Sequence, residues 1–243
     1  MPVQCISVVG TKFFHGIARL CEAVLCDLER DRVAKQIEES PRHDENAYCI
    51  SICTLASASI ESAVTRLLFL ENRRIDFKKV EPFKWLGEIY PKKLFVADEL
   101  AFIRGAILHN HLYQMEQNWS DETPSIKNIR KRPASGDGKY ENNVDPISNK
   151  TKCLKINAVP SRIRFIDMII FLNATSDLLN LMEKRSNNEL GFSGSRVELG
   201  SDRGLTLENL VTVLCKRLTS YDPTYEIDSA CSISQVSASP NIK

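Results

Sequence analysis

Glycine and proline are scarce in this chain, with ten of each among 243 residues. Both residues interrupt regular helices, so their scarcity favours a mostly helical protein. Positive charge is not in excess either, because the formal net charge is only +1. A global basic field that would attract nucleic acid is therefore excluded, and any RNA site must be a local patch.

The sequence has no uninterrupted run of about 20 apolar residues, the length that spans a bilayer as a helix. The segment that comes closest, residues 163–182, contains Arg164, Asp167 and Asp177. The first ten residues also lack the basic start and long apolar stretch of a signal peptide. We therefore expect a soluble protein in the cytoplasm that does not contact a membrane.

The eight cysteines form no Cys-x-x-Cys pair. Cys49 and Cys53 share the face of a predicted helix, but no histidine pattern completes a zinc site around them. Scattered cysteines of this kind are typical of free thiols in a reducing compartment. We expect no metal and no cofactor.

Apolar residues recur at helical spacing along most of the chain. The hydrophobic content of 43% is sufficient for a sizeable core. Ser161 is the expected N-cap of one long helix, and a polar tail is expected at 221–243. The predicted helices cover about 12–39, 44–72, 91–119, 161–184 and 205–218, with a short helix or link at 77–90 and a loop at 187–203.

The character of the sequence changes at about 120–160, where turn-forming residues gather. Residues 139–144 and 151–157 alternate and are expected to pair as a β-hairpin around Pro146–Lys150. We predict an all-α helical bundle that forms a single domain over 1–220. The small hairpin is inserted between the helix at 91–119 and the helix that follows.

The most informative segment is 99–113, which holds Arg104, His109 and His111 on one predicted helix. A guanidinium binds phosphate, and an imidazole transfers protons near neutral pH. On a straight helix Arg104 and His111 lie about 20° apart, whereas Arg104 and His109 lie about 140° apart. A local bend, or an arginine from a second copy of the chain, would bring His109 to the guanidinium. The alternative is chance spacing, with these side chains in solvated or core-capping positions.

The segment from Ile103 to Tyr113 resembles the signature of HEPN-domain proteins, in which an arginine precedes a histidine by four to six intervening residues. The resemblance implies an all-α fold, a homodimer and a metal-independent endoribonuclease of antiphage or toxin–antitoxin systems. Arg104, His109 and His111 would then be catalytic. Asn110 and Glu61 would support them, and an antitoxin or defence protein would be a partner.

With RNA as substrate, the resemblance implies cleavage to a 2′,3′-cyclic phosphate and a 5′-hydroxyl. The most basic stretch supplies candidate contacts to the RNA backbone, or a solvated surface loop: Lys127, Arg130, Lys131 and Arg132. Gly105 stands where the family more often has a polar residue. This glycine favours a second hypothesis, a non-catalytic HEPN-like module that binds RNA, a nucleotide or a protein. A third hypothesis is a helical interaction protein in which the motif is a coincidence.

Overall fold

The structure of the protein is a computed structural model. It describes residues 10–34, 43–71, 80–108, 113–118, 125–131 and 139–221. Within these ranges the chain forms seven α-helices and three two-stranded antiparallel sheets. The mainly helical fold that the sequence predicts is confirmed, and the described residues hold more strands than the single predicted hairpin.

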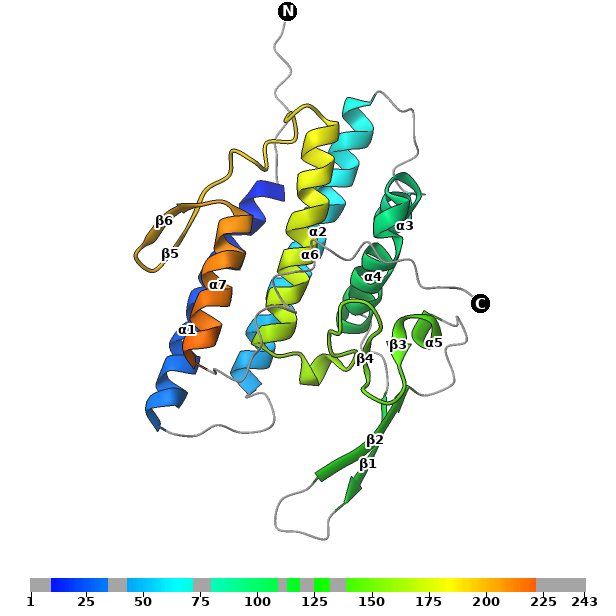
Figure 1. Cartoon of the computed structure of the whole chain (residues 1–243), viewed down its shortest axis with the longest axis vertical. Coiled ribbons are helices and arrows are strands. Elements are labelled where there is room, and N and C mark those ends of the chain that lie inside the picture. Colours follow the sequence, from blue (N-terminus) through cyan, green and yellow to red (C-terminus); the bar gives the residue numbers. More distant parts are fainter. Residues whose placement is uncertain are drawn as a thin grey trace, which may run out of the picture.

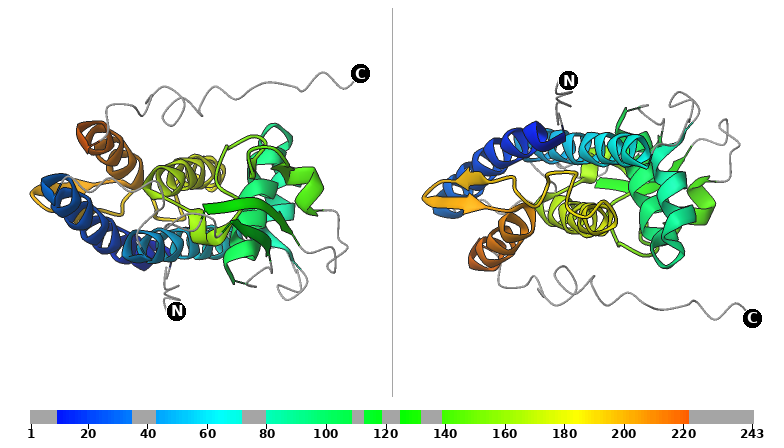
Figure 2. Two further views of the ribbon diagram at one scale, coloured as in Figure 1. Left: turned by 90° about the horizontal axis from the view of Figure 1, so that it is seen from below. Right: turned by 90° about the horizontal axis from the view of Figure 1, so that it is seen from above.

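Six of these helices form the body of the molecule. Figure 1 shows α2 and α6 side by side in its centre, with α1 and α7 on one side and α3 and α4 on the other, and Figure 2 shows the same order from two further directions. In chain order they are α1 (Gly10–Ala34), α2 (His43–Leu70), α3 (Pro82–Ile89), α4 (Leu94–Leu108), α6 (Phe165–Arg185) and α7 (Leu207–Tyr221).

Small side chains let α2 approach its neighbours closely. Ala56 and Ala63 of α2 are fully buried, and Gly16 of α1 lies so near that a Cβ atom there would sit 3.2 Å from Leu55 Cδ1. Larger apolar residues of the same helix, such as Ile52 and Ile60, fill the remaining space. The buried side chains of all six helices belong to one continuous core, whose burial is the main favourable term in folding.

The start of α6 differs from the prediction. Ser161 is not its N-cap, because residues 160–162 form a short 3₁₀ turn and the helix begins at Phe165. Arg164 occupies the N-cap position, and its backbone N–H donates to Asp167 Oδ2 over 2.9 Å. An acidic residue in the first turn can satisfy a free amide of the helix start in this way.

The helix that carries Arg104 is shorter than predicted. It ends at Leu108, and residues 113–118 form a strand, so the predicted helix to residue 119 is wrong. Strand β1 (Tyr113–Asn118) pairs antiparallel with β2 (Ser125–Lys131). Residues 114–116 have good helix propensity, but partners distant in sequence override such weak local preferences. Figure 1 shows the hairpin extending away from the helices.

The predicted hairpin at 139–157 is only partly correct. Residues 139–143 form the short helix α5 (Lys139–Asn143), and the pairing is limited to β3 (Val144–Asp145) and β4 (Lys150–Thr151). The turn between these strands lies where Pro146–Lys150 predicted it. An insertion with strands between α4 and α6 is therefore present. Of its longer hairpin, β1 lies in the segment predicted as helix, and β2 lies in a part of the insertion for which no strand was predicted.

A third hairpin occupies the predicted loop at 187–203. It consists of β5 (Val197–Leu199) and β6 (Asp202–Leu205). Val197 and Leu199 are buried against the core, and Glu198 between them is exposed. That alternation is the pattern of a half-buried strand, and it places the hairpin beside α1.

Two helices, Asp44–Leu70 and Phe165–Arg185, are long and apolar enough to cross a membrane by length and composition alone. This differs from the expectation that no such segment exists. Their most apolar windows are 50% and 72% buried inside the protein, as expected of the central helices of a bundle. Core helices of soluble proteins meet the same criterion, so this is weak evidence for a membrane protein.

Candidate functional site

Arg104 of α4 lies against Glu61 of α2. The Arg104 Nε atom is 2.7 Å from Glu61 Oε1, and the two side chains are 34% and 32% exposed. Each residue follows a fully buried isoleucine, Ile103 on α4 and Ile60 on α2. The ion pair therefore lies at the edge of the packed α2–α4 contact. The HEPN resemblance implies that Glu61 supports Arg104, and the structure places the two side chains in contact.

The contact holds the guanidinium but does not use all of its donors. A guanidinium has five N–H donors in a planar fork, and the contact with Glu61 uses the one at Nε. A half-exposed pair of this kind contributes roughly 0–1 kcal/mol to stability. Its more important effect is to fix the orientation of Arg104 at the surface.

The remaining residues of the motif lie outside the described ranges. His109, Asn110 and His111 follow directly after the last residue of α4, Leu108. The helical projection that placed Arg104 close to His111 and away from His109 assumed one helix to residue 119. Because the described helix ends at Leu108, the angles between Arg104 and the two histidines on a straight helix do not apply.

Three of the four basic candidates for RNA contact belong to the β1–β2 hairpin. The backbone of β2 carries Lys127, Arg130 and Lys131, paired in register with Glu116, Gln114 and Tyr113 of β1. Arg132 lies outside the described residues. The hairpin follows α4 in the chain. Residues 109–124, which include β1, connect the Arg104 helix to β2.

A buried carboxylate on α4 was not singled out by the sequence analysis. Glu99 is 2% exposed, and its two carboxylate oxygens accept the backbone N–H groups of Cys153 and Leu154 over 2.6 and 2.7 Å. Burial raises the pKa of Glu99, while those two N–H groups lower it. The sequence did contain a signal for this burial: Glu99 lies on the apolar stripe of the helix, beside Leu100 and one turn before Ile103.

Glu99 and a second buried carboxylate, Asp167, hold the same loop from two helices. Asp167 accepts the backbone N–H and the side-chain amide of Asn157 over 3.0 and 2.9 Å. Its pKa is raised by burial, against the hydrogen bonds of Asn157 and Arg164. The segment at 150–157 is therefore hydrogen-bonded to both α4 and α6, which connects the Arg104 helix to the centre of the protein.

The part of the chain that the structure describes contains no metal site or disulfide that would form a second candidate site. No group of three or more His, Cys, Asp or Glu side chains there is arranged to hold a metal ion. The six cysteines in these ranges are free, with Cys49 and Cys53 buried and Cys26 exposed. Burial raises the pKa of the Cys49 thiol, and the neighbouring Cys53 raises it further.

No protein-family model matches the sequence, and no curated protein or solved structure is similar enough to count as a match. The functional argument therefore depends on the motif and on the geometry around Arg104.

Proposed function

We propose that this protein is a HEPN-like, metal-independent endoribonuclease. The observation that carries the proposal is the motif arginine: Arg104 is held by Glu61 at 2.7 Å and stays partly exposed, five residues before His109 and seven before His111 in the chain. An oriented guanidinium next to imidazoles in sequence suits the cleavage of a phosphodiester without a bound metal.

The proposed reaction is an internal transesterification. The 2′-hydroxyl of a ribose attacks the adjacent phosphorus, so that the bond from O2′ to phosphorus forms and the bond from phosphorus to O5′ breaks. One imidazole, from His109 or His111, accepts the 2′-hydroxyl proton, and an imidazole protonates the leaving O5′. The products are a 2′,3′-cyclic phosphate and a 5′-hydroxyl.

In this mechanism Arg104 stabilises the charge that develops on the non-bridging phosphoryl oxygens. Glu61 is a positioning residue, because it contacts the guanidinium and not the RNA. Asn110 orients a histidine or contacts a base. No cofactor is part of the proposal.

We assign RNA binding to three residues of β2, Lys127, Arg130 and Lys131, and to Arg132, which follows them in the sequence. With a net charge of only +1, such a local patch must supply most of the attraction to the phosphate backbone. The proposed assembly is a homodimer in the cytoplasm. Its proposed context is antiphage defence or a toxin–antitoxin pair, with a cognate protein that restrains the nuclease.

A second candidate function is a non-catalytic HEPN-like module that binds RNA, a nucleotide or a protein partner. Two observations favour it: Gly105 follows the motif arginine, and the Nε donor of Arg104 is already bound to a carboxylate. In this reading the ion pair ties two helices together and contributes nothing to a reaction.

Cleavage of RNA, as against binding without cleavage, separates the two functions. We expect the wild-type protein, in a buffer with EDTA, to cut RNA and leave cyclic phosphate and 5′-hydroxyl ends. It should leave a matched oligonucleotide with deoxyribose at the cut sites intact, because the attacking hydroxyl is absent. Binding of both oligonucleotides without cleavage of either would support the non-catalytic module. Cleavage of both would contradict the mechanism.

A further inference from the structure

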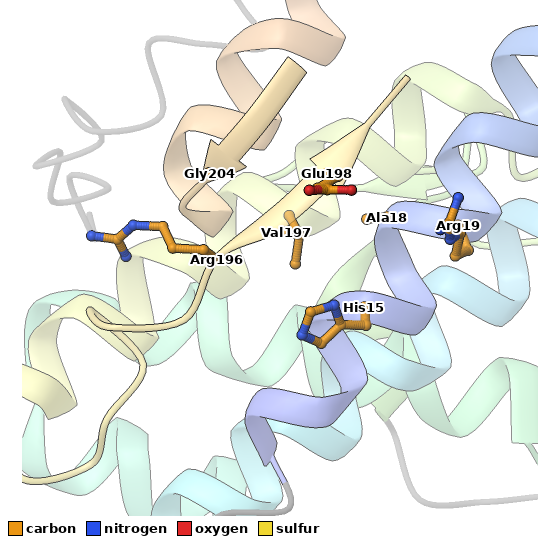
Figure 3. A pocket seen from close by; sticks show the side chains of 7 residues that line it. All are labelled: His15, Ala18, Arg19, Arg196, Val197, Glu198 and Gly204. Carbon is orange, nitrogen blue, oxygen red and sulfur yellow. The ribbon is translucent and has the colours of Figure 1, made fainter. Parts of the chain in front are cut away.

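A groove of about 280 Å³ lies between α1 and the β5–β6 hairpin. Figure 3 shows the side chains that line it, with His15 and Arg19 contributed by α1 and Glu198 by β5. Two buried residues also line it, Ala18 and Val197, each 2% exposed. The groove therefore combines an apolar floor with charged and polar walls.

The fold accounts for this arrangement. His15 and Arg19 are four residues apart on α1, so they lie on the same face of the helix. On β5 the alternation of a strand buries Val197 and exposes Glu198. In Figure 1 α1 and this hairpin lie on the opposite side of α2 and α6 from α4, so the groove is separate from the Arg104 site.

The cationic groups of the groove differ in their freedom to reach a ligand. Arg19 contacts Glu22 at 3.0 Å, but these side chains are 76% and 36% exposed, and such an exposed pair is weak enough to be exchanged for a ligand. Arg196 donates from Nη1 to the carbonyl oxygens of Ser193 and Ser195, and Figure 3 shows its guanidinium directed away from His15. Arg19 and His15 are therefore the groups placed to bind an anion.

We propose that this groove binds a small phosphorylated sugar of up to mononucleotide size. Arg19 and His15 donate to the phosphate, since guanidinium and imidazole groups are strong partners of phosphate oxygens. Glu198 accepts hydrogen bonds from sugar hydroxyls, because an ionised carboxylate is an acceptor only. The volume lies just below the range of about 300–1,000 Å³ that is typical of sites for larger ligands, which limits the occupant to a small molecule.

Titration of the full chain by calorimetry tests the proposal with four probes: ribose 5-phosphate, adenosine monophosphate, inorganic phosphate and adenosine. We expect saturable binding of the two phosphorylated sugars, weaker binding of phosphate and none of adenosine. Arg19→Ala should weaken binding of ribose 5-phosphate roughly tenfold or more. Glu198→Gln should reduce the preference for ribose 5-phosphate over phosphate and leave phosphate binding nearly unchanged.

Two control variants make the result specific. Arg30→Ala removes an exposed arginine of the same helix that pairs with Asp27, and Arg104→Ala removes the arginine of the proposed nuclease site. Both should bind ribose 5-phosphate as the wild type does. The proposal is overturned if no phosphorylated sugar binds at millimolar concentration, if Arg19→Ala binds normally while its circular dichroism is native, or if Arg104→Ala abolishes binding. The outcome is independent of RNA cleavage.

Discussion

Arg104 Nε and Glu61 Oε1 are 2.7 Å apart and join α4 to α2. A second pair in the protein matches it closely: Arg217 Nη2 lies 2.7 Å from Asp202 Oδ2, with side chains 34% and 41% exposed. The second pair joins α7 to β6, on the far side of α2 and α6 from α4. The two pairs have the same separation and similar exposure, so comparing variants of both separates a structural effect from an effect on the proposed site.

The first prediction concerns Glu61→Gln, with Asp202→Asn as its matched control. Both variants should lower the free energy of unfolding by less than about 1 kcal/mol, because each removes a half-exposed ion pair. Only Glu61→Gln should slow RNA cleavage, by roughly tenfold, since only Glu61 orients Arg104. Denaturant unfolding and single-turnover cleavage measure the two effects. Equal cleavage by both variants would show that Glu61 does not position the arginine.

A second prediction concerns the buried carboxylate of α4. Glu99→Ala leaves the N–H groups of Cys153 and Leu154 without their acceptor, and each buried donor left unmade costs about 1–3 kcal/mol. We expect a loss of several kcal/mol in the free energy of unfolding, measured by urea denaturation. Glu88→Ala, at an exposed position of α3, should change stability by less than about 0.5 kcal/mol. Similar losses of stability in the two variants would contradict a stabilising role for the hydrogen bonds of Glu99.

A third prediction follows from the pKa of Glu99, which burial raises above its ordinary value of 4.5 despite the opposing N–H groups. The folded state then binds this proton more tightly than the unfolded chain. The resulting stability is present below pH 4.5 and is lost as the pH rises through the folded-state pKa. The free energy of unfolding of wild type, minus that of Glu99→Gln, should therefore be highest in acid. It should decrease as the pH rises above 4.5. Unfolding curves at several pH values measure it, and a difference that grows with pH would contradict the raised pKa.

A fourth prediction concerns thiol reactivity. Burial raises the pKa of Cys21 and Cys53 far above the usual range of a thiol, whereas Cys26 is exposed. Because the thiolate is the reactive form, an alkylating reagent should label Cys26 in the native protein and label Cys21 and Cys53 only after unfolding. Peptide mass spectrometry after a short exposure identifies the labelled sites. Native labelling of Cys53 at the rate of Cys26 would contradict the buried core.

The helices were predictable where an apolar stripe persists over several turns. Ile17 and Val24 on α1 are buried as their spacing indicates. The strands were not predictable in the same way. Residues 114–116 have good helix propensity, and they form a strand only because β2 pairs with them across an intervening segment, a contact that local sequence does not encode.

The candidate site was predictable in part. The resemblance to HEPN domains implied that Glu61 supports Arg104, and the two side chains are in contact. The sequence did not indicate that Glu99 would accept two backbone N–H groups from a loop more than fifty residues away. Burial of a carboxylate depends on partners brought by tertiary structure, so the spacing of apolar residues alone cannot reveal it.

The most direct test of the central claim is cleavage of an end-labelled RNA in EDTA by wild type, Arg104→Ala, His109→Ala and His111→Ala, with Arg217→Ala as the matched control. We expect metal-independent cleavage that falls by about 10²–10³-fold in Arg104→Ala and is lost in at least one histidine variant. Arg217→Ala should cut at the wild-type rate. An inactive wild type, or equal cleavage by all five proteins, would contradict an Arg104–histidine nuclease.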